Sequence, residues 1–180
     1  MKVSKLTGLN FMALCCILGL FTKKLINPFA NIITEVLHIP GGVSTGFSIM
    51  FLVIAKEIVG GKSSGTLMAT VQGLLALALG RLGSMGILMP IAYIATGIAI
   101  DFIYYIAKYI KFTQIERMVF ANAFAAFMAS LIANILVFQL PMSVMGLYYV
   151  VSLLSGTCFG MLGSYLAVRL NIALNISKGV

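Results

Sequence analysis

Six long apolar runs decide what this chain can fold into. They cover roughly residues 6–27, 43–59, 64–81, 85–108, 114–139 and 143–168 of a 180-residue chain. A helix that crosses the hydrocarbon core of a bilayer needs about 20 mostly apolar residues. The sequence therefore predicts an all-α membrane protein, a compact bundle of six transmembrane helices that takes up residues 1–180 as a single domain.

Composition and charge exclude two other classes of protein. The chain is 61% hydrophobic and only 9% charged, with a mean hydropathy of +1.11, whereas an ordinary soluble domain carries about 25% charged residues. The net charge of +8 is scattered between the apolar runs, without the basic stripe and interleaved aromatic residues of a nucleic-acid-binding surface. We expect the lipid bilayer, and no nucleic acid, as a partner.

Turn residues separate the runs, and the first connection on the outer side is the longest. Pro28 follows the first run, and "PGG" at 40–42 precedes the second. Because proline interrupts a helix, we expect residues 29–37 to form a short re-entrant or interfacial helix. Outer loop 1 would then cap the bundle.

The positive residues in the loops predict the orientation, because cytoplasmic loops carry the excess of Lys and Arg. With the N-terminus inside, the outer face has three of the twelve positive residues: Lys23, Lys24 and Arg81. The inner face has the other nine: Lys2, Lys5, Lys56, Lys62, Lys108, Lys111, Arg117, Arg169 and Lys178. Both termini are therefore predicted to be cytoplasmic.

The stretch "EVLHIPGG" at 35–42 holds the only histidine of the chain, on the predicted outer side. Glu35 and His38 could face the same way on a helical turn, but two donors do not make a closed metal site. Cys15, Cys16 and Cys158 all lie within apolar runs and read as small hydrophobic residues. No metal site is predicted, although one histidine is enough to serve as a single axial ligand to haem iron.

Nothing in the sequence predicts an enzyme. The acids Glu35, Glu57, Asp101 and Glu116 lie in four separate places, and no catalytic motif joins them. "GGKSS" at 60–64 lacks the earlier glycine of a phosphate-binding loop, because position 56 is lysine. Asp101 stands inside an apolar run, where an ion pair with Lys108 or another inner-surface contact is as good an interpretation as a proton relay.

The outer halves of the runs combine aromatic rings with a few hydrogen-bonding groups, which is the usual lining of a small-molecule pocket. Tyrosine is also ordinary at a membrane interface. The candidate substrate-binding residues are Glu35, His38, Phe47, Ser48, Gln72, Arg81, Tyr93, Asn134, Tyr148 and Tyr149.

Small residues recur every four positions on the last two runs, as at Ala121 and Ala125 and at Gly156 and Gly160. Such faces let membrane helices approach closely. Packing inside the bundle is the simpler interpretation, and docking of a partner subunit is the alternative.

Taken together, six short helices, both ends inside, a basic charge and a large outer first loop resemble the substrate-binding S components of energy-coupling factor (ECF) transporters. Residues 40–80, "PGGVSTGFSIMFLVIAKEIVGGKSSGTLMATVQGLLALALG", look most like the YkoE-like S components linked to thiamine and its pyrimidine precursor. The features that carry this likeness are Gly41-Gly42, the turn at 62–65 and Gly80. "HIPGG" also echoes the His-Ile-Pro run of nickel and cobalt S components, but here it is internal.

The resemblance implies a multi-pass protein of a bacterial or archaeal cell membrane that captures a vitamin or vitamin precursor, without a cofactor. A transmembrane coupling subunit (the T component) and two ATPase subunits would be its partners. Many S components dock that subunit through an AxxxA face on the first helix, where this chain has Cys15 and Gly19. Two other functions stay open: a haem or other tetrapyrrole or metal-cofactor S component that uses His38, and an MreD-like membrane scaffold without transport activity.

Overall fold

The computed structural model describes residues 5–36, 38, 43–80 and 83–173, and over these residues it contains helices and no strands. The all-α prediction is confirmed. The six α-helices are α1 (Lys5–Val36), α2 (Val43–Val59), α3 (Ser64–Ala78), α4 (Met89–Ile110), α5 (Gln114–Ala133) and α6 (Met142–Ala173). A 3₁₀ turn, η1 (Gly83–Leu88), precedes α4, and a π-helical turn, η2 (Asn134–Phe138), extends α5.

Among the described residues, three segments are long and apolar enough to cross a membrane: Met85–Ile110, Gln114–Phe138 and Met142–Ile172. The two parts of α1 would make a fourth if they form one bent span. The structure fits a membrane-embedded protein, but six crossings are not confirmed. At 1.5 Å per residue, the 17 residues of α2 and the 15 residues of α3 reach only about 25 and about 22 Å, less than a core of about 30 Å.

The first helix differs from the sequence prediction. Instead of ending near residue 27 before a separate helix, α1 continues through Pro28 to Val36 and bends by 46° between Gly8–Thr22 and Ile26–Ile32. The ring of a proline clashes with the carbonyl group four residues earlier, and residue 24 lies within this bend. The proline therefore bends the helix without ending it.

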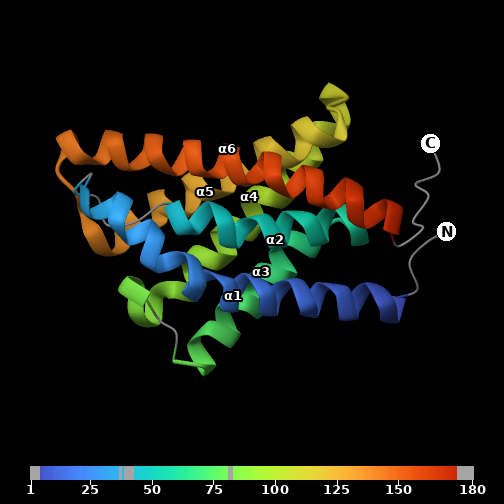
Figure 1. Cartoon of the computed structure of the whole chain (residues 1–180), viewed down its shortest axis with the longest axis horizontal. Helices are drawn as coiled ribbons and strands as arrows, with labels where there is room; N and C mark the ends of the chain where they lie inside the picture. The colour runs from blue at the N-terminus through green and yellow to red at the C-terminus, as the bar shows by residue number, and fades with distance from the viewer. Residues whose placement is uncertain (1–4, 37, 39–42, 81–82, 174–180) are drawn as a thin grey trace.

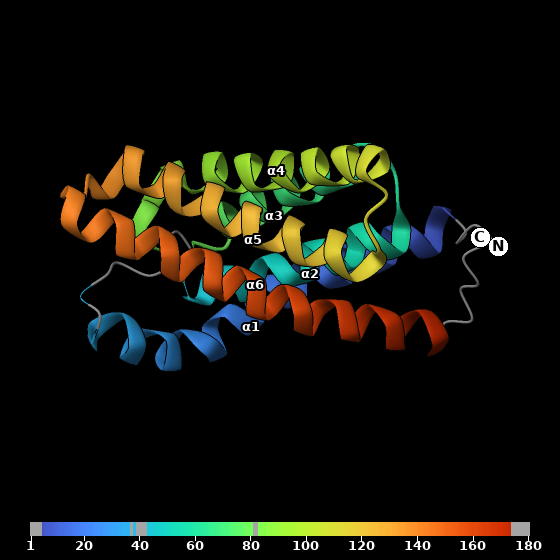
Figure 2. The ribbon, with the colours of Figure 1, turned by 90° about the horizontal axis from the view of Figure 1, so that it is seen from above.

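The long helices lie side by side, and the start of α1 and the end of α6 lie at the same end of the bundle (Figures 1 and 2). The helix α2 is central, in contact with α1, α5 and α6. All residues from 52 to 58 are buried, and they include Lys56 and Glu57. Each end of the bundle contains a cavity, and the central helix α2 contributes residues to both cavities.

The small-residue faces pack inside the bundle, as the simpler interpretation predicted. A Cβ atom on Gly156 would lie 2.7 Å from the Cα atom of Ala123, and one on Gly160 would lie 2.9 Å from the Cα atom of Val119. Only glycine permits α5 and α6 to approach this closely. Asn122, on the same face of α5, donates to the carbonyl groups of Gly46 and Gly156 at 3.1 and 2.7 Å.

The other residues considered for partner docking are also buried. Ala121 and Ala125 are fully covered, and Cys15 is 3% exposed. A Cβ atom on Gly19 would lie 2.5 Å from Nε2 of Gln72, so α1 and α3 are in close contact there. These residues join helices of the same chain and present no exposed surface.

Candidate ligand cavity

A cavity of about 290 Å³ lies at the end of the bundle opposite the start of α1. Its walls come from the last turns of α1, the first turns of α2, α4 and α6, the end of α5, and Met85 of η1. The described lining residues with polar side chains are Asn27, Asn31, Ser44, Thr45, Ser48, Tyr93, Thr96, Ser130 and Tyr148. The remaining described wall is apolar, with Met89 and Ile49 among its larger side chains.

Tyr93 presents a hydroxyl group that interacts with the Ser48 side chain and makes no hydrogen bond of standard geometry to a described residue. Its side chain is 8% exposed and lies beside Ser48. Leaving a buried polar group unpaired costs about 1–3 kcal/mol, and a tyrosine hydroxyl can both donate and accept. This atom is therefore the most direct hydrogen-bonding point for a molecule that enters the cavity.

Gln72 does not line the cavity, but its side chain lies near Ser48, which does. A Cβ atom on Gly19 would be 2.5 Å from Nε2 of Gln72 and 3.2 Å from the carbonyl oxygen of Ser48, so both groups lie next to Gly19. The Gln72 side chain is fully buried, and its Nε2 donates to the carbonyl oxygen of Cys16 at 3.4 Å. Its Oε1 atom has no partner among the described residues. The polar region thus extends from the cavity wall toward α1 and α3.

Ser48, Tyr93 and Tyr148 are the candidate residues that the fold brings together at the cavity. Tyr148 is 3% exposed, and its ring lies 6.1 Å from the ring of Phe138 in an edge-on arrangement. These three residues come from α2, α4 and α6, so no sequence motif joins them. Each helix carries its residue within the turns nearest this end of the bundle.

Asn134 and Tyr149 have another role. Asn134 Nδ2 donates to the Tyr149 hydroxyl at 3.0 Å, and Asn134 Oδ1 accepts from the backbone N–H of Leu140 at 2.9 Å. Gln139 between them has a left-handed backbone with φ of 46°. This pair closes the turn between α5 and α6, and neither residue lines the cavity.

Phe47 packs into the core, with its ring 5.4 Å from that of Phe51 and 5.1 Å from that of Phe159. Glu35 and His38 are exposed and do not line the cavity. His38 has φ of 52°, and its backbone N–H donates to the carbonyl oxygen of Glu35 at 3.2 Å, which forms the turn at the end of α1. Arg81 lies outside the described residues.

Several lining residues were not among the sequence candidates. Asn27 stands at the predicted end of the first run and Asn31 in the predicted short helix 29–37, because Pro28 indicates a helix end there. Their spacing of four residues on one continued helix would have placed both on one face. Thr96 and Ser130 lie one or two turns deeper along α4 and α5 than the interface positions that the aromatic residues indicated.

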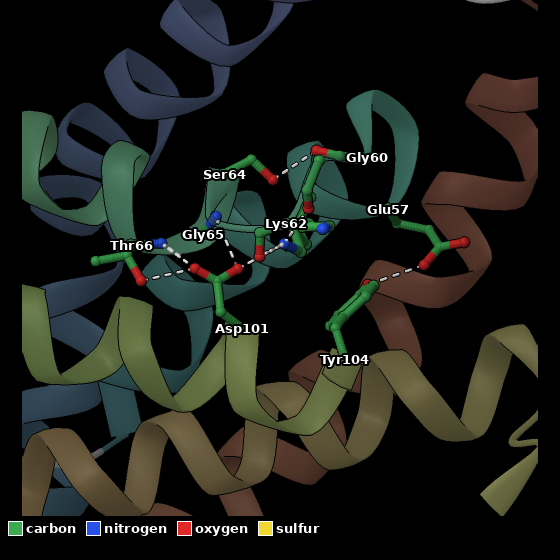
Figure 3. Close-up of polar contacts among 10 residues, drawn as sticks. Glu57, Gly60, Lys62, Ser64, Gly65, Thr66, Asp101 and Tyr104 are labelled. Carbon is green, nitrogen blue, oxygen red and sulfur yellow. Dashed lines mark hydrogen bonds and ion pairs between the residues drawn. The ribbon is translucent and has the colours of Figure 1, made fainter. Parts of the chain in front are cut away.

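A cluster of charged residues lies at the other end of the bundle, and Figure 3 shows polar contacts within it. Lys56 Nζ donates to Asp101 Oδ1 at 2.5 Å and to the carbonyl groups of Gly61 and Lys62 at 2.6 and 3.1 Å. Asp101 also accepts from the backbone N–H groups of Gly65 and Thr66 at 3.1 and 2.8 Å, and from the Thr66 hydroxyl at 2.6 Å. Asp101 thus caps the first turn of α3 from α4.

The expected pairing of Asp101 with Lys108 is wrong in its partner, because Asp101 pairs with Lys56 on α2. Of the alternatives left open for Asp101, the structure shows an ion pair, and the carboxylate is fully used by it and by the cap. Sequence spacing pointed to Lys108 on the same helix, while the fold places Lys56 closer. Only contacts between helices could distinguish the two lysines.

A second ion pair stands beside the first. Arg117 donates through Nη2 and Nε to the Glu57 carboxylate at 2.8 and 3.2 Å, and Tyr104 donates its hydroxyl to the same carboxylate at 2.9 Å. The Arg117 guanidinium also lies 5.3 Å from the centre of the Tyr104 ring. This geometry joins α2, α4 and α5 through charge-assisted hydrogen bonds.

No family model, curated protein or solved structure matches this chain. Within the part of the chain that the structure describes, no three His, Cys, Asp or Glu side chains come together in a way that could hold a metal ion. The function is therefore argued from the geometry of the cavity and from the sequence.

Proposed function

We propose that this chain is the substrate-binding S component of an ECF-type importer. It captures a vitamin or vitamin precursor, with a thiamine or pyrimidine type favoured, in the cavity between α1, α2, α4, α5 and α6. The observation that carries the proposal is the buried Tyr93 hydroxyl beside Ser48, without a hydrogen bond of standard geometry, in the wall of a cavity of about 290 Å³. A buried polar atom of this kind is suited to select a ligand by hydrogen bonding.

The size of the cavity supports a ligand of one or two rings. An apolar cavity of about 150 Å³ in another protein holds one benzene molecule, so the cavity here, about 290 Å³, has room for about two such rings. A tetrapyrrole with four rings needs far more space. His38, which the haem alternative requires as a ligand, is exposed and does not line the cavity.

The chemistry of the wall supports a flat molecule with both donors and acceptors. Tyr93 and Tyr148 offer aromatic surface, and contacts between rings contribute roughly 0.5–1.5 kcal/mol beyond their buried area. The serine, threonine and asparagine side chains can donate or accept hydrogen bonds. A membrane scaffold of the MreD type has no use for such a cavity, which is why we rank it below a binding protein.

In the proposed transport cycle this chain binds the substrate, and the partner subunits supply the energy for its release. Its cavity opens toward the outside of a bacterial or archaeal cell, with both termini in the cytoplasm. A coupling subunit and two ATPases then drive release on the inner side. Alone in a liposome, the chain binds its substrate without accumulating it.

The test compares two tyrosines that differ in their hydroxyl partners. In Tyr93→Phe we expect the affinity for the ligand to fall roughly 2- to 13-fold, which is the net loss of one hydrogen bond. The thermal stability should stay equal or rise, because a buried hydroxyl without a hydrogen bond of standard geometry is removed. In Tyr149→Phe the Asn134 bond is lost, so stability should fall while affinity is retained.

The measurements are mass spectrometry of small molecules that co-purify with the chain, followed by calorimetric titration with thiamine and its pyrimidine precursor. Thermal unfolding of both variants gives the stability. Equal affinity in Tyr93→Phe and the parent would remove this cavity from the proposal. Failure of every vitamin-sized ligand to bind would leave the scaffold as the better reading.

A further inference from the structure

The charged end of the bundle contains a second and larger cavity, of about 620 Å³. It lies between the end of α2, the loop that leads to α3, the end of α4 and the start of α5. Four positive and two negative side chains line it, a net charge of +2. These residues are Lys56, Lys62, Lys108, Arg117, Glu57 and Asp101.

The two acids are committed to ion pairs within the chain. Asp101 is held by Lys56 and the first turn of α3, and Glu57 by Arg117. Lys62 and Lys108 are exposed, and neither makes an ion pair with a described residue. The surplus positive charge of the cavity therefore comes from these two lysines, beside an arginine that has five N–H donors and uses two of them for Glu57.

The surface of α4 next to this cavity carries the kinds of side chain that contact a membrane lipid. Ile98, Phe102, Tyr105 and Tyr109 lie along one face of the helix, and each is more than half exposed. The hydroxyl groups of Tyr105 and Tyr109 are 3.0 Å apart, and Tyr105 also lines the cavity. Tyrosine rings mark the headgroup level of a bilayer, so apolar, aromatic and cationic groups follow one another toward the end of α4.

We propose that this cavity binds the phosphate group of an anionic phospholipid. Lys62 and Lys108 attract the phosphate, Arg117 offers further donors, and the acyl chains lie along the exposed face of α4. Basic pockets between helices at the cytoplasmic side of a membrane bind anionic headgroups in this way. The site is independent of the ligand cavity at the opposite end.

The experiment uses the purified full chain in detergent and three variants. The probes are phosphatidylglycerol, which is anionic, and phosphatidylcholine, whose choline neutralises the phosphate. Inorganic phosphate and glycerol 3-phosphate at millimolar concentration represent free phosphate. Native mass spectrometry gives the lipid affinity, and thermal unfolding gives the stabilisation by each probe.

We expect phosphatidylglycerol to be retained and to raise the unfolding temperature more than phosphatidylcholine does. Each lysine near an anionic lipid surface contributes roughly fivefold in affinity, so Lys62→Gln together with Lys108→Gln should weaken binding roughly 30-fold. Replacing both lysines by arginine should retain it. Arg169→Gln removes a charge in the last turns of α6 that does not line the cavity, and should leave the affinity within about twofold by the same reasoning.

Three outcomes would overturn the proposal. The first is that the glutamine double variant binds phosphatidylglycerol as the parent does. The second is that Arg169→Gln loses as much affinity as the double variant, which means that only general surface charge attracts the lipid. Equal stabilisation by free phosphate and by phosphatidylglycerol would assign the site to a soluble anion. Both lysines are exposed, so a loss of folding does not confuse the comparison.

Discussion

At the scale of single residues, the buried charges are the clearest case of one side chain with two structural roles. The side chains of Lys56 and Asp101 are only 3% and 14% exposed, where an unpaired charge is very costly. Asp101 both neutralises Lys56 and accepts from the first backbone N–H groups of α3. Ser63 at the start of α3 makes no side-chain cap of its own, so the cap has to come from α4.

These roles predict that removing Asp101 lowers the free energy of unfolding more than removing Lys56 does. Asp101→Ala leaves the Lys56 ammonium group buried without a counter-charge and α3 without a cap, which should lower the free energy of unfolding by about 3–5 kcal/mol. Lys56→Met leaves Asp101 with three remaining donors and should cost less. Thermal and denaturant unfolding in detergent measure both, with Glu116→Gln as a surface control that keeps a capping box. A larger loss in Lys56→Met than in Asp101→Ala would contradict this account.

At the scale of the elements, the packing of α5 against α6 depends on glycines whose neighbours are backbone atoms. A Cβ atom on Gly156 would meet the Cα atom of Ala123 at 2.7 Å, which no side-chain rotation can relieve. Gly146 on the same helix has nothing within 4 Å of such an atom. The two glycines differ in their surroundings, although both lie within α6.

The pair therefore provides a matched test of close packing. Gly156→Ala has to separate α5 from α6 and should destabilise the protein by roughly 1–3 kcal/mol. Gly146→Ala should raise stability by up to about 1 kcal/mol, because alanine favours a helix more than glycine does. Unfolding temperatures of the two variants in one detergent decide the matter. If both shift equally and in the same direction, the close contact does not contribute.

At the scale of the whole molecule, each end of the bundle has its own chemistry. The end that contains the start of α1 and the end of α6 has the larger cavity, with most of the described positive side chains near it. The opposite end has the smaller cavity, and none of its described lining residues is charged. Because positive residues gather on the cytoplasmic side, the first of these ends is expected to face the cytoplasm.

Cysteine labelling in intact cells measures this orientation. In a background with the three native cysteines replaced, Met142→Cys, at an 83% exposed position at the start of α6, should react with a membrane-impermeant maleimide. Lys111→Cys, at the exposed turn after α4, should react only after the cells are permeabilised. The reverse pattern would invert the topology and place the proposed ligand cavity on the inner side.

What the sequence by itself determined is the helical class, the approximate helix positions and the internal use of the small-residue faces, because hydropathy and spacing act along the chain. The end of α3 at Ala78 and the bend of α1 through Pro28 appear only in the structure, because helix continuation depends on packing against neighbours. The same holds for the site. Ser48, Tyr93 and Tyr148 could be chosen from the sequence as polar or aromatic residues near helix ends. Asn134, Tyr149 and Phe47 met the same criterion, but they contact partners on distant turns and other helices and do not line the cavity. Lys56 replaced Lys108 as the partner of Asp101 for the same physical reason: a charge pairs with whichever group the tertiary fold brings within hydrogen-bonding distance.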